Sequence, residues 1–105
     1  VKTTTLPSGK NHVFWGITGE YAFKMRKKLH NLIQPGDIFV DDDCKYCGEM
    51  LDGVPICAPD VLNGFPKDAV IIIMYSNPVD VVKRLKMQAG CDGRQIFSAD
   101  ELCTN

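Results

Sequence analysis

The sequence has no excess of charge of either sign and no hydrophobic run long enough for a membrane helix. Its 105 residues include 12 Lys and Arg against 13 Asp and Glu, for a formal net charge of −1. This balance does not indicate a nucleic-acid partner. The longest apolar run, AVIIIMY at residues 69–75, is far shorter than the roughly 20 residues of a bilayer span. We therefore expect no nucleic-acid binding and no membrane span.

Complete catalytic motifs are also missing. Short-chain epimerases and dehydratases use a Tyr-x-x-x-Lys pair, but none of Tyr21, Tyr46 and Tyr75 has lysine four residues later. The sequence contains no Gly-x-Ser-x-Gly elbow, no HExxH helix and no P-loop lysine motif. His12 and His30 are expected at the surface or at a sheet edge, without a chemical role. We predict no catalytic residue and no stand-alone activity.

The five cysteines do not form a recognisable disulfide or metal framework. They are an odd number, at positions 44, 47, 57, 91 and 103. Cys44-Lys-Tyr-Cys47 resembles half of a zinc knuckle, but a closed zinc site needs four ligands and no second Cys-x-x-Cys exists. We predict reduced thiols and no bound metal; structural zinc and a redox Cys-x-x-Cys are the alternatives.

Apolar residues alternate between strand-like runs and helical faces along the chain. Strands are predicted at residues 12–16, 38–40, 53–57, 69–75 and 95–98, and helices at 20–33, 58–62 and 78–89. Such alternation predicts a three-layer α/β/α, Rossmann-like fold with a mainly parallel sheet of four principal strands. The first strand should lie between the second strand and the 69–75 strand.

The predicted organisation is one domain. Residues 1–11 read as a polar N-terminal lead-in, and residues 12–105 as a single Rossmann-like, nucleotide-binding domain. The lead-in lacks the apolar stretch of a secretory signal, so we expect a cytoplasmic protein.

A turn with two glycines separates the first predicted strand from the first predicted helix. Backbone N–H groups and the helix dipole converge at such a turn and bind phosphate in doubly wound folds. Gly16, Gly19 and Ala22 are spaced as GxxGxxA, whereas the dinucleotide fingerprint is GxGxxG. Asp41 follows the second predicted strand, about where an acid binds ribose hydroxyls. The pattern favours a nucleotide site, and a simple strand-to-helix corner with a solvated acidic turn is the alternative.

The predicted site lies where the first, second and 69–75 strands end, because open α/β sheets bind ligands beyond the carboxyl ends of their strands. The predicted cofactor-binding residues are Gly16, Ile17, Thr18, Gly19, Asp41, Asp43, Ser76 and Asn77. The charge of Asp41 would repel the 2′-phosphate of NADP, which favours NAD or a nucleotide-sugar. Glu20, on the first helical turn, would compete with an incoming phosphate for the same helix end.

Residues 39–62, FVDDDCKYCGEMLDGVPICAPDVL, resemble a signature of small Rossmann-like domains in bacterial polysaccharide-biosynthesis enzymes. These include the N-terminal domains of sugar-nucleotide epimerase/dehydratases and of sugar acyltransferases, and modules attached to methyltransferases or glycosyltransferases. The positions in register are Gly48, Gly53, Pro55, Pro59 and Leu62. The resemblance covers about residues 12–98 and departs from the family in the first turn, where members usually carry GxGxxG.

The resemblance implies a nucleotide or nucleotide-sugar binding module of a larger carbohydrate-modifying enzyme. Its ligand would be NAD or a nucleotide-sugar, and the chemistry would come from a catalytic domain or chain that acts as its partner. The alternative is a degenerate Rossmann-like domain that serves only in protein assembly and binds no ligand.

Overall fold

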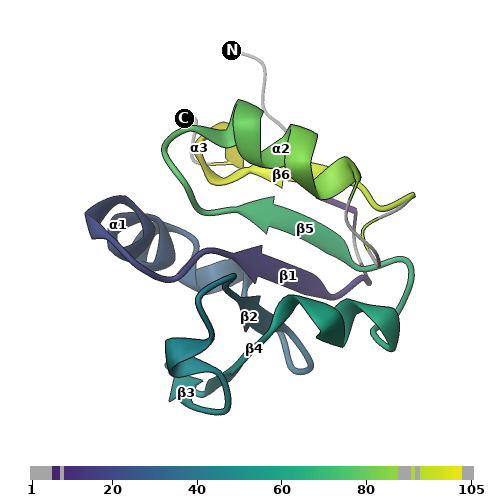
Figure 1. Cartoon of the computed structure of the whole chain (residues 1–105). Coiled ribbons are helices and arrows are strands. Elements are labelled where there is room, and N and C mark those ends of the chain that lie inside the picture. Colours follow the sequence, from purple (N-terminus) through teal and green to yellow (C-terminus); the bar gives the residue numbers. More distant parts are fainter. Residues whose placement is uncertain (1–5, 8, 88–90, 92, 103–105) are drawn as a thin grey trace.

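The structure is a computed structural model that describes residues 6–7, 9–87, 91 and 93–102. Within these residues, a six-stranded sheet with the order β3-β4-β2-β1-β5-β6 forms the centre of the molecule (Figure 1). The strands are β1 (His12–Trp15), β2 (Ile38–Val40), β3 (Met50–Leu51), β4 (Val54–Cys57), β5 (Val70–Ile73) and β6 (Ile96–Ser98). All neighbouring strands are parallel except β3, which is antiparallel to β4.

The described helices are α1 (Glu20–Lys28), α2 (Pro78–Lys86) and α3 (Ala99–Leu102), with 3₁₀ helices η1 (His30–Leu32), η2 (Cys44–Tyr46) and η3 (Pro59–Asn63). The α/β class, the mostly parallel sheet and the central place of β1 between β2 and β5 are confirmed. The prediction of four principal strands is corrected to six strands in the described part of the chain. Strand β3 and helix α3 were not predicted.

Strand β3 exists because a tight turn folds it back onto β4. Asp52 and Gly53, the two residues between these strands, have φ angles of 53° and 79°. Positive φ at both central positions is typical of a type I′ turn, for which Asp-Gly is a favoured sequence. The pairs Met50 with Pro55 and Leu51 with Val54 then follow.

The first helix is shorter than the predicted range of 20–33. Helix α1 ends at Lys28, and the chain continues as the 3₁₀ helix η1. The N–H groups of Leu32 and Ile33 donate to carbonyls three residues back, on Leu29 and His30. The α conformation is disfavoured for the residue before a proline, so the helix cannot run through Gln34 into Pro35. Helix α2 ends at Lys86, and residues 88–89 of its predicted range lie outside the described residues.

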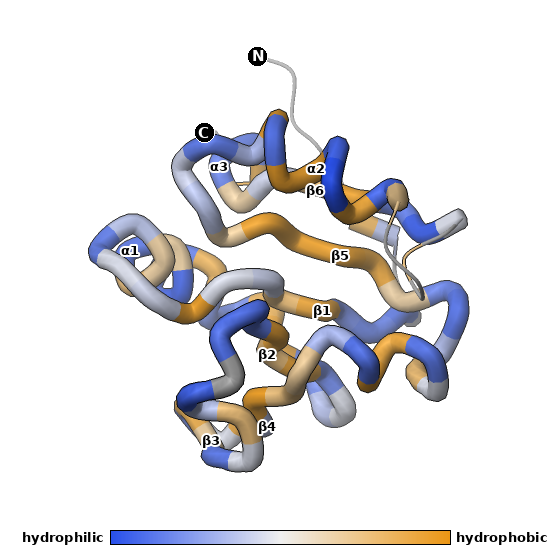
Figure 2. The backbone as a smooth tube through the Cα atoms, viewed as in Figure 1, coloured by the Kyte–Doolittle hydropathy of each residue, from blue (hydrophilic) through white to orange (hydrophobic). Residues whose placement is uncertain are grey.

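The sheet is covered on both faces. On one face, Phe14 and Ile72 pack with Ala22 and Met25 of α1 and with Ala99 of α3. Residues one position along each strand point to the other face, where Val13 and Ile71 pack with Leu62 of η3 and Leu85 of α2. Figure 2 shows the hydrophobic residues concentrated along the central strands. The architecture is therefore three layers, compatible with a Rossmann-like fold.

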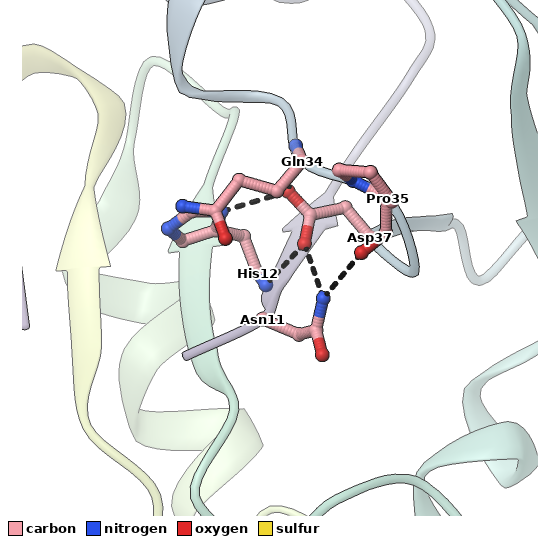
Figure 3. Close-up of polar contacts among 5 residues, drawn as sticks. All are labelled: Asn11, His12, Gln34, Pro35 and Asp37. Atoms are coloured by element: carbon pink, nitrogen blue, oxygen red, sulfur yellow. Dashed lines mark hydrogen bonds and ion pairs between the residues drawn. The ribbon is translucent and has the colours of Figure 1, made fainter. Parts of the chain in front are cut away.

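A buried polar cluster joins the start of β1 to the turn before β2 (Figure 3). The Asp37 carboxylate accepts hydrogen bonds from the His12 N–H (2.9 Å), the Gln34 N–H (2.8 Å) and the Asn11 amide (2.9 Å), and His12 Nδ1 lies 2.8 Å from Asp37 Oδ2. Asn11 also donates to the Pro35 carbonyl. These contacts fix the register of β1 against β2.

The prediction that His12 is a surface or edge residue is wrong. His12 and Asp37 are each only 2% exposed, and His12 is the first residue of a central strand. Burial raises the pKa of Asp37, but the hydrogen bonds from His12, Asn11 and Gln34 outweigh it and hold that pKa below its usual value. The cluster lies at the N-terminal ends of the strands, opposite the edge where the predicted site lies.

Candidate functional site

The loops after β1 and β2 are held together at the C-terminal edge of the sheet. The Gly16 N–H donates to the Val40 carbonyl (2.8 Å), and the Ile17 N–H donates to Asp41 Oδ2 (2.9 Å). Two of the backbone groups that we predicted to face a diphosphate are therefore engaged with the end of β2. Thr18 and Gly19 are exposed and lie directly before α1.

Asp41 stands at the predicted place but in unpredicted surroundings. It is 3% exposed, and its other oxygen, Oδ1, accepts a hydrogen bond from the Asp43 N–H (2.9 Å). Both carboxylate oxygens therefore accept hydrogen bonds from backbone N–H groups. Through these bonds Asp41 holds together the loops after β1 and β2. Asp43 is exposed, and its carboxylate accepts from the Lys45 N–H (3.1 Å). Ribose binding by either aspartate stays a prediction.

The segment after β5 contributes an aromatic ring to the edge of the sheet. The Tyr75 ring lies against Gly16, where an added Cβ would be 2.9 Å from Tyr75 Cζ. This contact sits between β1 and β5, the place where the strand order reverses and where such sheets bind ligands. Ser76 and Asn77 are exposed beyond it, and the Asn77 amide donates to Asp80 Oδ2 (3.0 Å) at the start of α2.

The Tyr75 hydroxyl has a higher pKa than an ordinary tyrosine. Burial, followed by the charges of Asp41 and Asp42, raises the pKa of Tyr75 to about 12, against the opposing effect of Arg84. Arg84 Nη2 lies 2.6 Å from Asp42 Oδ2, so α2 is also tied to the loop after β2.

We expect this shift to appear as a loss of stability in alkali. A folded state that holds the Tyr75 proton more tightly than the unfolded chain gains stability that is complete below pH 10 and is lost as the pH rises to about 12. The difference in tyrosinate absorbance between the parent and Tyr75→Phe should titrate near pH 12, and Tyr75→Phe should lose this part of the pH dependence. A Tyr75 transition at or below pH 10 would contradict the assignment.

A groove of about 470 Å³ opens between the loop after β1 and the β3–β4 hairpin. It is lined by Ile17, Thr18, Gly19, Arg26, Tyr46, Glu49, Met50, Leu51 and Ile56. Of the predicted site residues, three line this groove, namely Ile17, Thr18 and Gly19. The other five lie outside its lining.

Arg26 is the cation of this groove. Its Nη1 donates to the Ile17 carbonyl (2.7 Å), which ties helix α1 to the loop before it and leaves the remaining guanidinium donors to other acceptors. Burial lowers the pKa of Arg26, and the charge of Asp52 acts in the opposite direction. Arg26 was not among the predicted site residues, because it lines a groove with Leu51 only once the β3–β4 hairpin has formed. The Asp52-Gly53 dipeptide was the signal that could have predicted that hairpin.

The N-terminus of α1 lies beside this groove and has no side-chain cap. Gly19, the residue before the helix, has φ 94° and ψ 164°, and as a glycine it has no side chain that could cap the helix. The positive end of the helix dipole favours an anion here. Glu20 in the first turn opposes an anion, and the Lys24 ammonium, 3.6 Å from Glu20 Oε1, partly offsets it.

The thiols that the structure describes do not assemble into a metal site. Cys47, Cys57 and Cys91 form no disulfide, and burial raises the pKa of the Cys57 and Cys91 thiols. Among the described residues, no group of three or more His, Cys, Asp or Glu side chains could hold a metal ion. The side chain of Cys44 and the whole of Cys103 lie outside the description, so the absence of zinc stays a prediction.

The fold and groove define a mostly parallel α/β protein with a concave surface between the loop after β1 and the β3–β4 hairpin. No helix among the described residues is both long and apolar enough to cross a membrane. No family model matches the sequence, and no curated protein and no solved structure matches it either. The resemblance to polysaccharide-biosynthesis domains therefore stays a prediction.

Proposed function

We propose that this chain is a nucleotide or nucleotide-sugar binding module of a larger carbohydrate-modifying enzyme of polysaccharide or lipopolysaccharide biosynthesis. The chemistry would be supplied by another domain or chain. The observation that carries the proposal is the groove beside the N-terminus of α1, which combines exposed backbone, a guanidinium and an apolar floor. Ligand sites commonly have this composition, mostly apolar with a few polar groups that fix orientation.

The groove suggests how such a ligand would lie. The phosphates would meet the backbone of Thr18 and Gly19, the dipole of α1 and the guanidinium of Arg26. Ile17 and Ile56 would lie against a base or sugar ring, and Tyr46 offers an aromatic side chain in the same lining. This placement suits NAD or a nucleotide-sugar, since both join a diphosphate to ring systems.

A second candidate function is protein assembly without a ligand. It is favoured by the edge between β1 and β5, where carboxylates gather and an aromatic ring occupies the space. The Tyr75 ring occupies the space beside Gly16, and Asp41, Asp42 and Asp43 follow β2. Carboxylates repel phosphates, and a ring against Gly16 keeps a diphosphate from that part of the edge. The ligand-binding proposal therefore rests on the groove at Arg26 and not on the edge between β1 and β5.

A ligand panel separates the two functions. We expect at least one of NAD, UDP-glucose, dTDP-glucose and GDP-mannose to raise the melting temperature, because a ligand at about 100 times its Kd adds roughly 2.7 kcal/mol to the free energy of unfolding. A panel in which no compound stabilises the protein would reject the proposal and favour the assembly function.

A negative charge introduced at the groove tests whether the ligand binds there. We expect Thr18→Asp to weaken the best ligand of the panel by about fivefold or more, since like charges about 4 Å apart repel by roughly 1 kcal/mol even in water. The matched control is Asn63→Asp, which adds the same charge on η3, across the sheet from α1. Isothermal titration measures both. Equal affinities in the two variants would place the ligand elsewhere.

A further inference from the structure

The groove beside Gly19 continues along α1 into a second concave region of about 380 Å³. This region, here called the cationic compartment, is lined by Phe23, Arg26, Lys27, His30, Leu51 and Asp52. Arg26 and Leu51 also line the first groove, so the groove and the cationic compartment are adjacent and have these two residues in common. A rise of about 1.5 Å per residue places Arg26 roughly 10 Å along the helix axis from Gly19. A ligand that touches both ends must therefore be longer than a diphosphate.

The compartment gathers positive charge on an exposed aromatic ring. The Lys27 ammonium lies 4.5 Å and the Arg26 guanidinium carbon 5.8 Å from the centroid of the Phe23 ring. Phe23 itself is 50% exposed, so its ring is accessible to a ligand. Contacts of this kind hold cations in place by the ring quadrupole. The ring therefore restricts where the two cations can move.

The balance of charge in the compartment favours an anion. Arg26 and Lys27 face one carboxylate in the lining, Asp52, with His30 as a further ring nitrogen donor or acceptor. The first groove is more evenly balanced, because Arg26 there faces Glu49. A guanidinium recognises the planar fork of a carboxylate with parallel hydrogen bonds, and a neighbouring ammonium adds a point charge. Phe23 and Leu51 supply apolar surface for the body of a ring.

We infer that the cationic compartment binds the carboxylate of an acidic sugar, so that the preferred ligands are nucleotide-activated uronic acids. This inference rests on the proposed function, because the nucleotide would occupy the first groove. Lys27 is the residue that distinguishes acidic from neutral sugars, since Arg26 is shared with the diphosphate and also holds the Ile17 carbonyl.

The test uses two matched pairs of ligands, UDP-glucuronate with UDP-glucose and GDP-mannuronate with GDP-mannose. In at least one pair we expect the acidic member to bind about threefold to tenfold more tightly, the range for a partly exposed charge-assisted contact. Lys27→Gln should abolish that preference while leaving the affinity for the neutral member within about twofold. Lys28→Gln, on the same helix but outside the lining, should keep the preference.

The outcomes separate this inference from the proposed function. Equal binding of acidic and neutral members would overturn the inference and leave the proposed function standing. A preference that survives in Lys27→Gln would also overturn it, because the carboxylate would then be bound elsewhere. Failure of all four ligands would overturn the inference, and if NAD and dTDP-glucose also fail, the proposed function is rejected with it.

Discussion

Replacing Asp37 by alanine should lower the free energy of unfolding by about 3–5 kcal/mol, because it removes a buried carboxylate that accepts several hydrogen bonds, and each unsatisfied buried donor costs about 1–3 kcal/mol. The substitution leaves His12, the Gln34 N–H and the Asn11 amide without their acceptor at a site where Asp37 is 2% exposed. Urea unfolding at neutral pH measures the loss. The suitable control is Asp68→Ala in the exposed turn before β5, for which we expect a change within about 0.5 kcal/mol.

The effect of Asp37→Ala should depend on pH in a defined direction. Because the pKa of Asp37 is lowered in the folded state, its stabilisation is present above the ordinary value of 3.8 and is lost as the pH falls below it. The parent and the variant should therefore converge in stability toward acid. A difference that stays constant down to pH 2, or one below about 1 kcal/mol at pH 7, would show that the cluster does not hold β1 to β2 as described.

Gly16→Ala should destabilise the protein by about 2–4 kcal/mol, because it combines backbone strain with a steric clash. Gly16 has a φ of 110°, which side chains rarely tolerate, and an added Cβ would come within 2.9 Å of the Tyr75 ring. Gly64→Ala is the matched control, since Gly64 has a φ of −114° and nothing within 4 Å of an added Cβ. We expect that control to be neutral or slightly stabilising.

A double-mutant cycle separates the two causes. In a Tyr75→Ala background the clash disappears and only the strain at Gly16 remains, so the penalty of Gly16→Ala should shrink by about 1–2 kcal/mol. Chemical denaturation of the four proteins gives the coupling energy. An unchanged penalty in the Tyr75→Ala background would mean that the ring does not pack against Gly16.

The central part of the fold was predictable because its signals are local. The run at residues 69–75 consists of residues that suit a strand buried on both faces, and β5 is such a strand. The GxxG turn and Asp41 were predicted to meet at one edge, and the hydrogen bond from the Ile17 N–H to Asp41 confirms that they do. What that carboxylate does there was not predictable, because its burial depends on how both loops pack.

Other features depend on contacts that the sequence does not display. The pairing of His12 with Asp37 arises from the register of β1 against β2, across 25 residues of chain. The end of α1 was misplaced because Leu32 and Ile33 continue the apolar periodicity although the chain has already left the helix. Arg26 lies among several cations of α1, and nothing in the sequence singles it out until the β3–β4 hairpin gives it a groove to line.

The most direct test of nucleotide binding at the groove is an amide NMR titration of the parent protein with NAD, UDP-glucose, dTDP-glucose and GDP-mannose. The proposal predicts saturable shift changes for at least one compound, centred on Thr18, Gly19, Arg26 and Leu51. The buried cluster at Asp37, at the opposite end of the sheet, should stay unchanged. Saturable changes centred away from the groove, or no saturable change with any of the four compounds, would contradict the account.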